Sequence, residues 1–205
     1  MSIRRAVLIT VLGTALTTAS TVAACRSSTS DDFGTPPAAS SAPTPVVAGT
    51  VPSTAPTVAP ARLRIPAVGL DAVVEAVGVD TGTGEFAVPA DVDRVGWYRF
   101  GPGYNASAGS IVIAGHVDAA DQGKGAFFRL GELESGDEVT LVGPGGRERT
   151  FEVTARKRYR KTAVPLDEYF ARDGVVRLTL ITCGGPFDTR TRHYRDNVVV
   201  TAVTA

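Results

Sequence analysis

From residue 62 onward, the chain breaks into short runs of β-forming residues separated by glycine, proline and aspartate. The segments between most of these runs are too short for the crossover helices that a doubly wound parallel sheet requires. We therefore expect residues 62–205 to form one mostly β domain, a closed or nearly closed barrel with short helices at 125–133 and 165–171. The predicted strands are residues 63–65, 72–79, 95–100, 110–115, 137–142, 150–158, 175–182 and 197–203.

The amino terminus has the pattern of an export signal. Arg4 and Arg5 precede residues 6–24, which carry no charge and end in small residues. Residues 22–25 (VAAC) resemble the bacterial lipoprotein box, which makes Cys25 a candidate lipid anchor; alternatively, Cys25 ends an uncleaved membrane helix. In both cases residues 1–25 are a signal peptide or membrane anchor. The remainder is expected at the extracytoplasmic face of the cell membrane, in a bacterial envelope.

Between this segment and the barrel, residues 26–61 are rich in serine, threonine, proline and alanine. Such a stretch has too few large apolar side chains to bury a core, and its prolines favour extended conformations. The sequence predicts a disordered stalk that lets the domain work at a distance from the membrane.

The overall charge argues against nucleic acid as a partner, because 21 Lys+Arg balance 21 Asp+Glu. A basic run at residues 156–161 is interpreted as a charged strand edge, although it can also meet wall polymers or anionic headgroups. The two cysteines and two histidines are scattered along the chain, so we predict neither a disulfide framework nor a metal site. No cofactor is expected.

Two predicted strands end in a reactive residue. Residues 110–115 lead directly into His116, and residues 175–182 lead into Cys183, which a Gly-Gly-Pro loop follows. An unpaired cysteine outside the cell is exposed to oxidation, so its presence calls for a reason. A thiolate beside an imidazole is a nucleophile with its acid–base partner. The alternative is a small buried cysteine and a structural histidine.

Two motifs resemble those of a known family. Residues 179–183 (TLITC) are similar to the TLxTC signature of sortases, and residues 115–118 (GHVD) resemble their active-site histidine region. Residues 180–188 and 194–200 most resemble the actinobacterial class F group, with class E next. The resemblance covers the whole predicted barrel.

This resemblance implies an eight-stranded sortase-type barrel and a cysteine transpeptidase. Cys183 would attack an LPxTG-like sorting signal of an exported protein and form a thioester. The acyl group would then pass to an amine of a cell-wall precursor. His116 would act as the acid, and Thr182 would help to bind the peptide backbone.

The oxyanion donor is less clearly marked, because in many sortases an arginine directly precedes the apolar triplet of the last strand. Here Asn197 holds that position. We assign the role to Arg195, which on an extended strand projects to the same face as Asn197. Arg192 and Asn197 itself are the alternatives.

Three other functions remain open at this point. An L,D-transpeptidase-like or hydrolytic cell-wall thiol enzyme usually carries its histidine shortly before the cysteine in one motif, whereas 67 positions separate His116 from Cys183. A non-catalytic lipoprotein that binds wall material is the third possibility, and the reactivity of Cys183 distinguishes it.

Overall fold

The computed structural model of the protein describes residues 32–38, 56–82 and 86–205. The predicted signal or anchor segment 1–25, including Cys25, lies outside the described residues, as does most of the linker 26–61. Across the described ranges, no helix is both long and apolar enough to cross a membrane.

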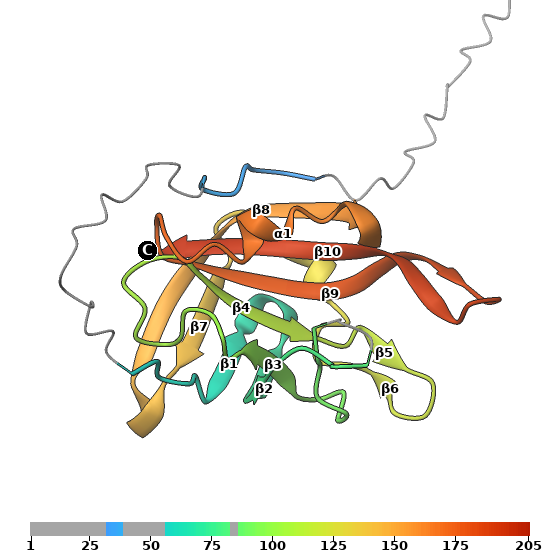
Figure 1. Ribbon diagram of the computed structural model, residues 1–205, viewed down its shortest axis with the longest axis horizontal. Coiled ribbons are helices and arrows are strands. Elements are labelled where there is room, and N and C mark those ends of the chain that lie inside the picture. The colour runs from blue at the N-terminus through green and yellow to red at the C-terminus, as the bar shows by residue number, and fades with distance from the viewer. Residues whose placement is uncertain (1–31, 39–55, 83–85) are drawn as a thin grey trace, which may run out of the picture.

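Eight strands close into a barrel, as the sequence predicts (Figure 1). Around the barrel the order is β1 (Arg62–Ile65), β2 (Leu70–Val77), β3 (Val95–Tyr98), β4 (Ser110–Gly115), β9 (Arg177–Asp188), β10 (His193–Thr204), β8 (Glu148–Arg160) and β7 (Glu138–Val142). Only the pairs β2–β3 and β4–β9 are parallel. Strands β9 and β10 run further than predicted and form a long hairpin that projects beyond the barrel (Figure 1).

The helical content is small, as the sequence predicts. The predicted helix at 165–171 is the short α1 (Leu166–Tyr169), and the one at 125–133 contains only the 3-10 turn η2 (Leu130–Glu132). The first half of that segment bonds elsewhere, since the amide of Phe127 donates to the carbonyl of His116. The other 3-10 turns are η1 (Pro66–Val68), η3 (Pro144–Gly146) and η4 (Lys161–Ala163). A small hairpin of β5 (Asp118–Ala119) and β6 (Gly123–Lys124), which was not predicted, follows β4.

The core fills the barrel interior with one face of each strand. Along β9, Leu178 and Leu180 belong to the buried core cluster, so the residues between them point outward. Along β4 the same alternation places Ile111 and Ile113 inside. The outward face of these two strands is the face on which the candidate site lies.

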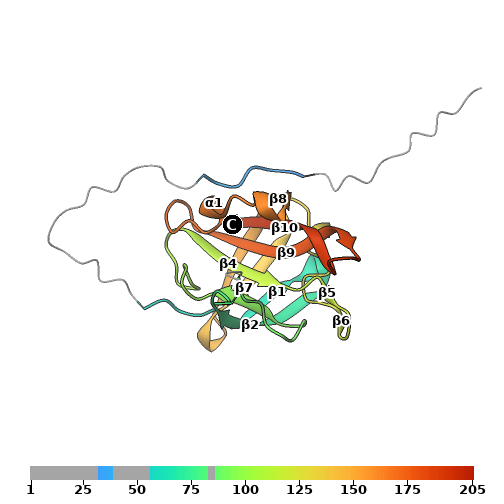
Figure 2. The same cartoon turned by 45° about the vertical axis from the view of Figure 1, so that its right-hand side comes forward.

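Two stretches of the predicted disordered linker pack on the barrel, at 32–38 and 56–61 (Figure 2). The Phe33 amide donates to the Arg156 carbonyl, and the Ala61 amide donates to the Val142 carbonyl, both across strand edges. Backbone groups of even a proline-rich segment are satisfied by an open strand edge. The expectation that all of residues 26–61 is disordered is therefore wrong for these two stretches.

Candidate active site

The register between β4 and β9 brings the two predicted catalytic residues together. These strands are parallel, and each partner pair from Ser110↔Arg177 to Ala114↔Ile181 differs by 67 in residue number. His116 and Cys183 differ by the same amount, so continuing this register places Cys183 beside His116. His116 directly follows the end of β4, whereas Cys183 lies inside β9, which runs on to Asp188 and does not end at the cysteine as the sequence predicts. The hydroxyl of Thr182 donates to the Gly115 carbonyl at 2.8 Å and ties the strands one residue before this point.

Both side chains lie on the outer face of the barrel. Because Leu180 points inward, Cys183 points outward, and the same alternation from Ile113 places His116 on that face. Cys183 is a free, partly exposed cysteine. A thiol at this position is open to a peptide that lies along the outside of the barrel.

Thr182 does not fit its predicted role in binding the peptide. It is buried on the inner face, and its hydroxyl is engaged by the Gly115 carbonyl. The β alternation that exposes Cys183 necessarily turns Thr182 inward. Its contribution is to hold β9 against β4 at the point where both catalytic candidates begin.

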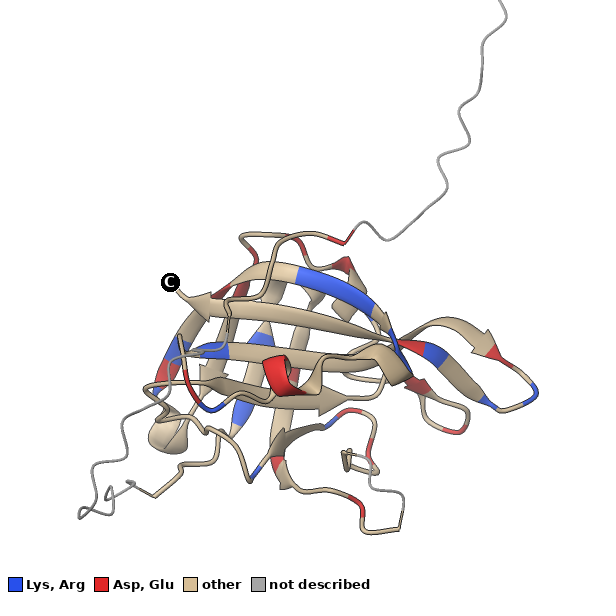
Figure 3. Cartoon of the chain, turned by 45° about the horizontal axis from the view of Figure 1, so that its top comes forward, with Lys and Arg blue, Asp and Glu red and all other residues tan. Residues whose placement is uncertain are grey.

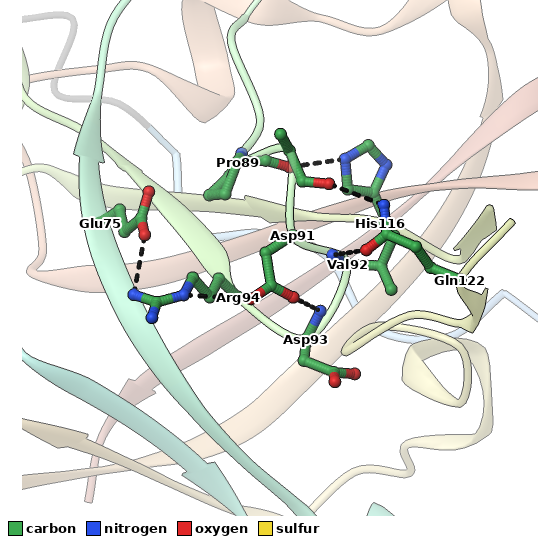
Figure 4. Close-up of polar contacts among 9 residues, drawn as sticks. Glu75, Pro89, Asp91, Val92, Asp93, Arg94, His116 and Gln122 are labelled. Carbon is green, nitrogen blue, oxygen red and sulfur yellow. Dashed lines mark hydrogen bonds and ion pairs between the residues drawn. The ribbon is translucent and has the colours of Figure 1, made fainter.

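A carbonyl from the β2–β3 loop holds the imidazole of His116 (Figure 4). Its Nε2 lies 2.9 Å from the Pro89 carbonyl oxygen. Since a carbonyl only accepts, Nε2 carries the proton. This leaves Nδ1 as the nitrogen that can exchange a proton with a neighbouring group.

The loop that carries Pro89 is itself fixed to the segment after His116. The side chain of Gln122 accepts from the Val92 amide and donates to the Ala90 carbonyl, at 3.2 and 3.1 Å. Arg94 joins the same loop to β2 through Glu75, at 2.9 Å (Figure 4). The loop that carries Pro89 is therefore tied both to the segment after His116 and to β2. The sequence contains no motif that marks Pro89 or Gln122.

On the other side of the thiol, β10 places Asn197 directly opposite Cys183. Arg195 lies two residues earlier, where the register between β10 and β9 shifts. Its Nη2 is 3.0 Å from Asp188 Oδ2, and the side chain is 52% exposed. Hydrogen bonding from Arg195, then from two backbone amides of the hairpin turn, lowers the pKa of Asp188 below its ordinary value.

The two alternative donors are placed differently. Arg192 lies in the turn between β9 and β10 with a φ of 58°, beyond the last pair of the hairpin, Asp188↔His193. It is therefore further along the hairpin from Cys183 than Arg195 is. Asn197 is the nearest of the three along the strand, because it is the cross-strand partner of the cysteine.

Tyr194 and Asp118 form a bridge across the site that sequence reasoning missed. The Tyr194 hydroxyl donates to Asp118 Oδ2 at 2.5 Å. This hydrogen bond, with burial and the negative charges of Asp118 and Cys183, raises the pKa of Tyr194 to about 12. Asp118 thereby joins β5 to β10.

The chain belongs to the sortase family, because the family model of the sortase domain matches residues 63–205. Sortases are cysteine transpeptidases. Among solved structures, sortase A from Corynebacterium diphtheriae is 21% identical with a TM-score of 0.54, over 74% of this chain and 63% of that one. Sortase C-1 from Actinomyces oris is 20% identical with a TM-score of 0.53, over 70% and 72%.

A pilus-related sortase C of Group B Streptococcus has a TM-score of 0.55 at 14% identity, over 75% of this chain and 69% of that one. At these identities the likeness concerns the fold. No curated protein sequence matches the chain.

Proposed function

We propose that this chain is a class F-like sortase that cleaves an LPxTG-like sorting signal and transfers the acyl group to a cell-wall amine. The observation that supports the proposal is the parallel register of β4 and β9, whose continuation sets Cys183 of β9 beside His116 at the end of β4. A structural cysteine needs no such arrangement. The substrate would lie along the outer face of these strands.

In the first half-reaction, the Cys183 thiolate attacks the scissile carbonyl carbon, and a carbon–sulfur bond forms. The carbon–nitrogen bond then breaks, and the imidazolium of His116 gives its proton to the departing amine. In the second half-reaction, an acceptor amine attacks the thioester and gives its proton to His116. Cys183 leaves as a thiolate, which restores the starting state.

Arg195 is the proposed donor to the oxyanion that forms on the carbonyl oxygen. Its guanidinium stays charged and offers several N–H groups to one oxygen. It is half-exposed and held by a single ion pair to Asp188. Ion pairs of a half-exposed arginine add little to stability, so Arg195 can leave Asp188 for the oxyanion.

The cellular setting is also a proposal. An export signal with Cys25 at its end would hold the protein at the extracytoplasmic face of the membrane. Its partners there would be the sorting signals of exported proteins and a cell-wall precursor that carries an amine. The resemblance at residues 180–188 and 194–200 supports class F within the family.

The proposal is tested by cleavage of a fluorogenic sorting-signal peptide with Cys183→Ala and the wild-type protein. We expect the variant to keep its circular dichroism spectrum and melting temperature and to lose all cleavage. The exposed variant Arg64→Ala, on β1, serves as the control that should keep full cleavage. Normal cleavage by Cys183→Ala would reject Cys183 as the nucleophile, whereas no cleavage by the wild-type protein would favour a non-catalytic wall-binding protein.

A further inference from the structure

A short piece of the linker, residues 32–38, lies along strand β8 and is called the strap below. The amides of Phe33 and Arg156 each donate to the other's carbonyl at 3.0 Å. The Arg158 amide donates to Asp32 Oδ1, also at 3.0 Å. Figure 1 shows the strap in blue beside β8. The strap thus adds a short antiparallel partner to the barrel wall.

Strand β8 has an open edge at this place. Its pairing with β7 ends at Glu138↔Glu152, whereas its pairing with β10 continues to Arg160. Beyond residue 153, the side of β8 that faces away from β10 therefore has no neighbouring strand of the barrel. Such an edge binds an extended segment through main-chain hydrogen bonds.

The strap fits this edge by shape as well as by backbone pairing. The guanidinium of Arg156 lies 5.0 Å from the centre of the Phe33 ring, and Phe33 also packs against the core. Gly34 has a φ of 68°, and a Cβ there would lie 2.0 Å from the Thr154 carbonyl oxygen. Phe33 is the only aromatic residue in the stretch 26–61. Phe33 and Gly34 thus give the strap specific contacts with β8, although the composition of the linker does not indicate them.

Docking changes the reach of the domain. Seven residue steps separate Cys25 from Asp32, and a chain of that length spans at most about 25 Å in any conformation. Without the strap, the 31 steps from Cys25 to Pro56, where the chain next contacts the barrel, could span about 110 Å. The strap therefore replaces a long tether with a short one attached at β8.

We propose that the strap holds the barrel beside the membrane, with β8 toward the anchor, and so limits how far from the membrane Cys183 can act. This inference rests on the proposed function and on the proposed anchor at Cys25. It replaces the expectation of a stalk that carries the domain away from the membrane. Cys183 lies on β9, two strands from β8, so the thiol stays within a few strand spacings of the tether.

The charge of β8 agrees with this orientation. The basic run 156–161 occupies the end of β8 beside the strap and the start of η4, and Figure 3 shows it as a blue stretch on the strand. The Arg160 side chain is 67% exposed, and Lys161 is exposed. Basic residues close to a membrane are attracted by anionic headgroups within a Debye length. An anionic lipid surface is thus the partner that fits this face.

The test uses the full chain with its anchor, reconstituted in vesicles of phosphatidylcholine and phosphatidylglycerol that contain a dansyl-labelled lipid. Trp97 is the only tryptophan and serves as the energy donor. Gly34→Val and Phe33→Ala should undock the strap, and Thr35→Ala, an exposed position in the same segment, is the control. Faster hydrogen exchange at the Arg156 and Arg158 amides would confirm undocking.

We expect energy transfer to fall in both undocked variants and to stay unchanged in the control. We also expect the wild type to cleave a sorting-signal peptide on a short lipid spacer several-fold better than on a long one. Undocking should abolish this preference and leave cleavage of the soluble peptide unchanged.

Three outcomes separate the possibilities. If undocking leaves both energy transfer and spacer preference unchanged, or if the wild type does not bind vesicles, the inference is overturned. If the wild type cleaves no peptide but energy transfer falls on undocking, the proposed function fails while the role of the strap in holding the barrel is supported. If only soluble peptide is cleaved by the vesicle-bound wild type, the membrane-proximal substrate is rejected.

Discussion

The hydroxyl of Tyr194 and the carboxylate of Asp118, 76 residues apart, meet at 2.5 Å and join the loop after His116 to the strand that carries Arg195. This one hydrogen bond therefore links the segment that carries His116 to the segment that carries Arg195. Neither Tyr194 nor Asp118 needs to touch the substrate for this bond to matter. We interpret both as positioning residues.

Removing this bond should lower turnover more than stability. For Tyr194→Phe we expect kcat/KM to fall about tenfold, with a loss of about 1 kcal/mol in the free energy of unfolding. The matched variant Phe187→Leu changes the neighbouring ring, which lies 5.1 Å from Tyr194, without removing the hydroxyl. Peptide cleavage and urea denaturation provide the two readouts. Unchanged kcat/KM in Tyr194→Phe would show that the bridge has no part in positioning.

The same bond gives a pH dependence at the alkaline end. The pKa of Tyr194 rises from 10.0 to about 12 because its neutral hydroxyl donates to Asp118. A raised pKa means that the stabilisation is complete below pH 10 and is lost as the pH rises toward 12. The stability difference between wild type and Tyr194→Phe should therefore shrink over this range in parallel urea titrations. A difference that stays constant from pH 9 to 12 would contradict the assignment.

The arginine assignment is tested by separate changes in one hairpin. Arg195→Ala should reduce kcat about 10²- to 10³-fold, the usual effect of losing an oxyanion donor. Arg192→Gly removes a guanidinium at the turn and suits the positive φ of that residue, so its turnover should stay within about twofold. If Arg195→Ala keeps normal turnover, Asn197→Ala becomes the variant that should lose it.

The loop behind the histidine offers a prediction about indirect positioning. Gln122→Ala removes two of the hydrogen bonds that tie the Pro89 loop to the segment after His116 and leaves the one from the Ala126 amide to the Val92 carbonyl. We expect kcat to fall about five- to tenfold with little change in KM, because the peptide-binding face of β4 and β9 is unaffected. Gln122→Glu keeps the acceptor for the Val92 amide and should recover part of the activity. A change in KM alone would place Gln122 in substrate binding instead.

Much of the barrel follows from local patterns, and the catalytic pair follows from them as well. Predicted strands lead into His116 and Cys183 in the sequence, and parallel pairing of those strands brings the residues together without further information. The contacts of Pro89 and Tyr194 depend on the path of polar loops, which no periodicity encodes. The role of Thr182 could not be decided from the sequence, because a threonine suits both a strand interior and a peptide-binding position. The inward direction of its side chain, which only the structure shows, engages its hydroxyl with the Gly115 carbonyl.

Arg177 gives a prediction about stability. It is fully buried, its Nη2 donates to the Glu168 carbonyl, and burial lowers its pKa below the ordinary value. Arg177→Ala should cost about 3 kcal/mol, because it opens a cavity and leaves carbonyls unpaired. The exposed Arg64→Ala should cost less than about 1 kcal/mol in the same urea experiment. Equal losses of unfolding free energy in the two variants would mean that buried Arg177 does not stabilise the segment between β8 and β9, which contains Glu168.

The claim that Cys183 is an acylation site is tested most directly by intact-mass spectrometry of the protein quenched in acid during turnover of a sorting-signal peptide. We predict a mass increase equal to the acyl half of the peptide, located on Cys183 after digestion and absent from Cys183→Ala. An absence of this adduct while the peptide is being cleaved, or an adduct on another residue, would contradict the account.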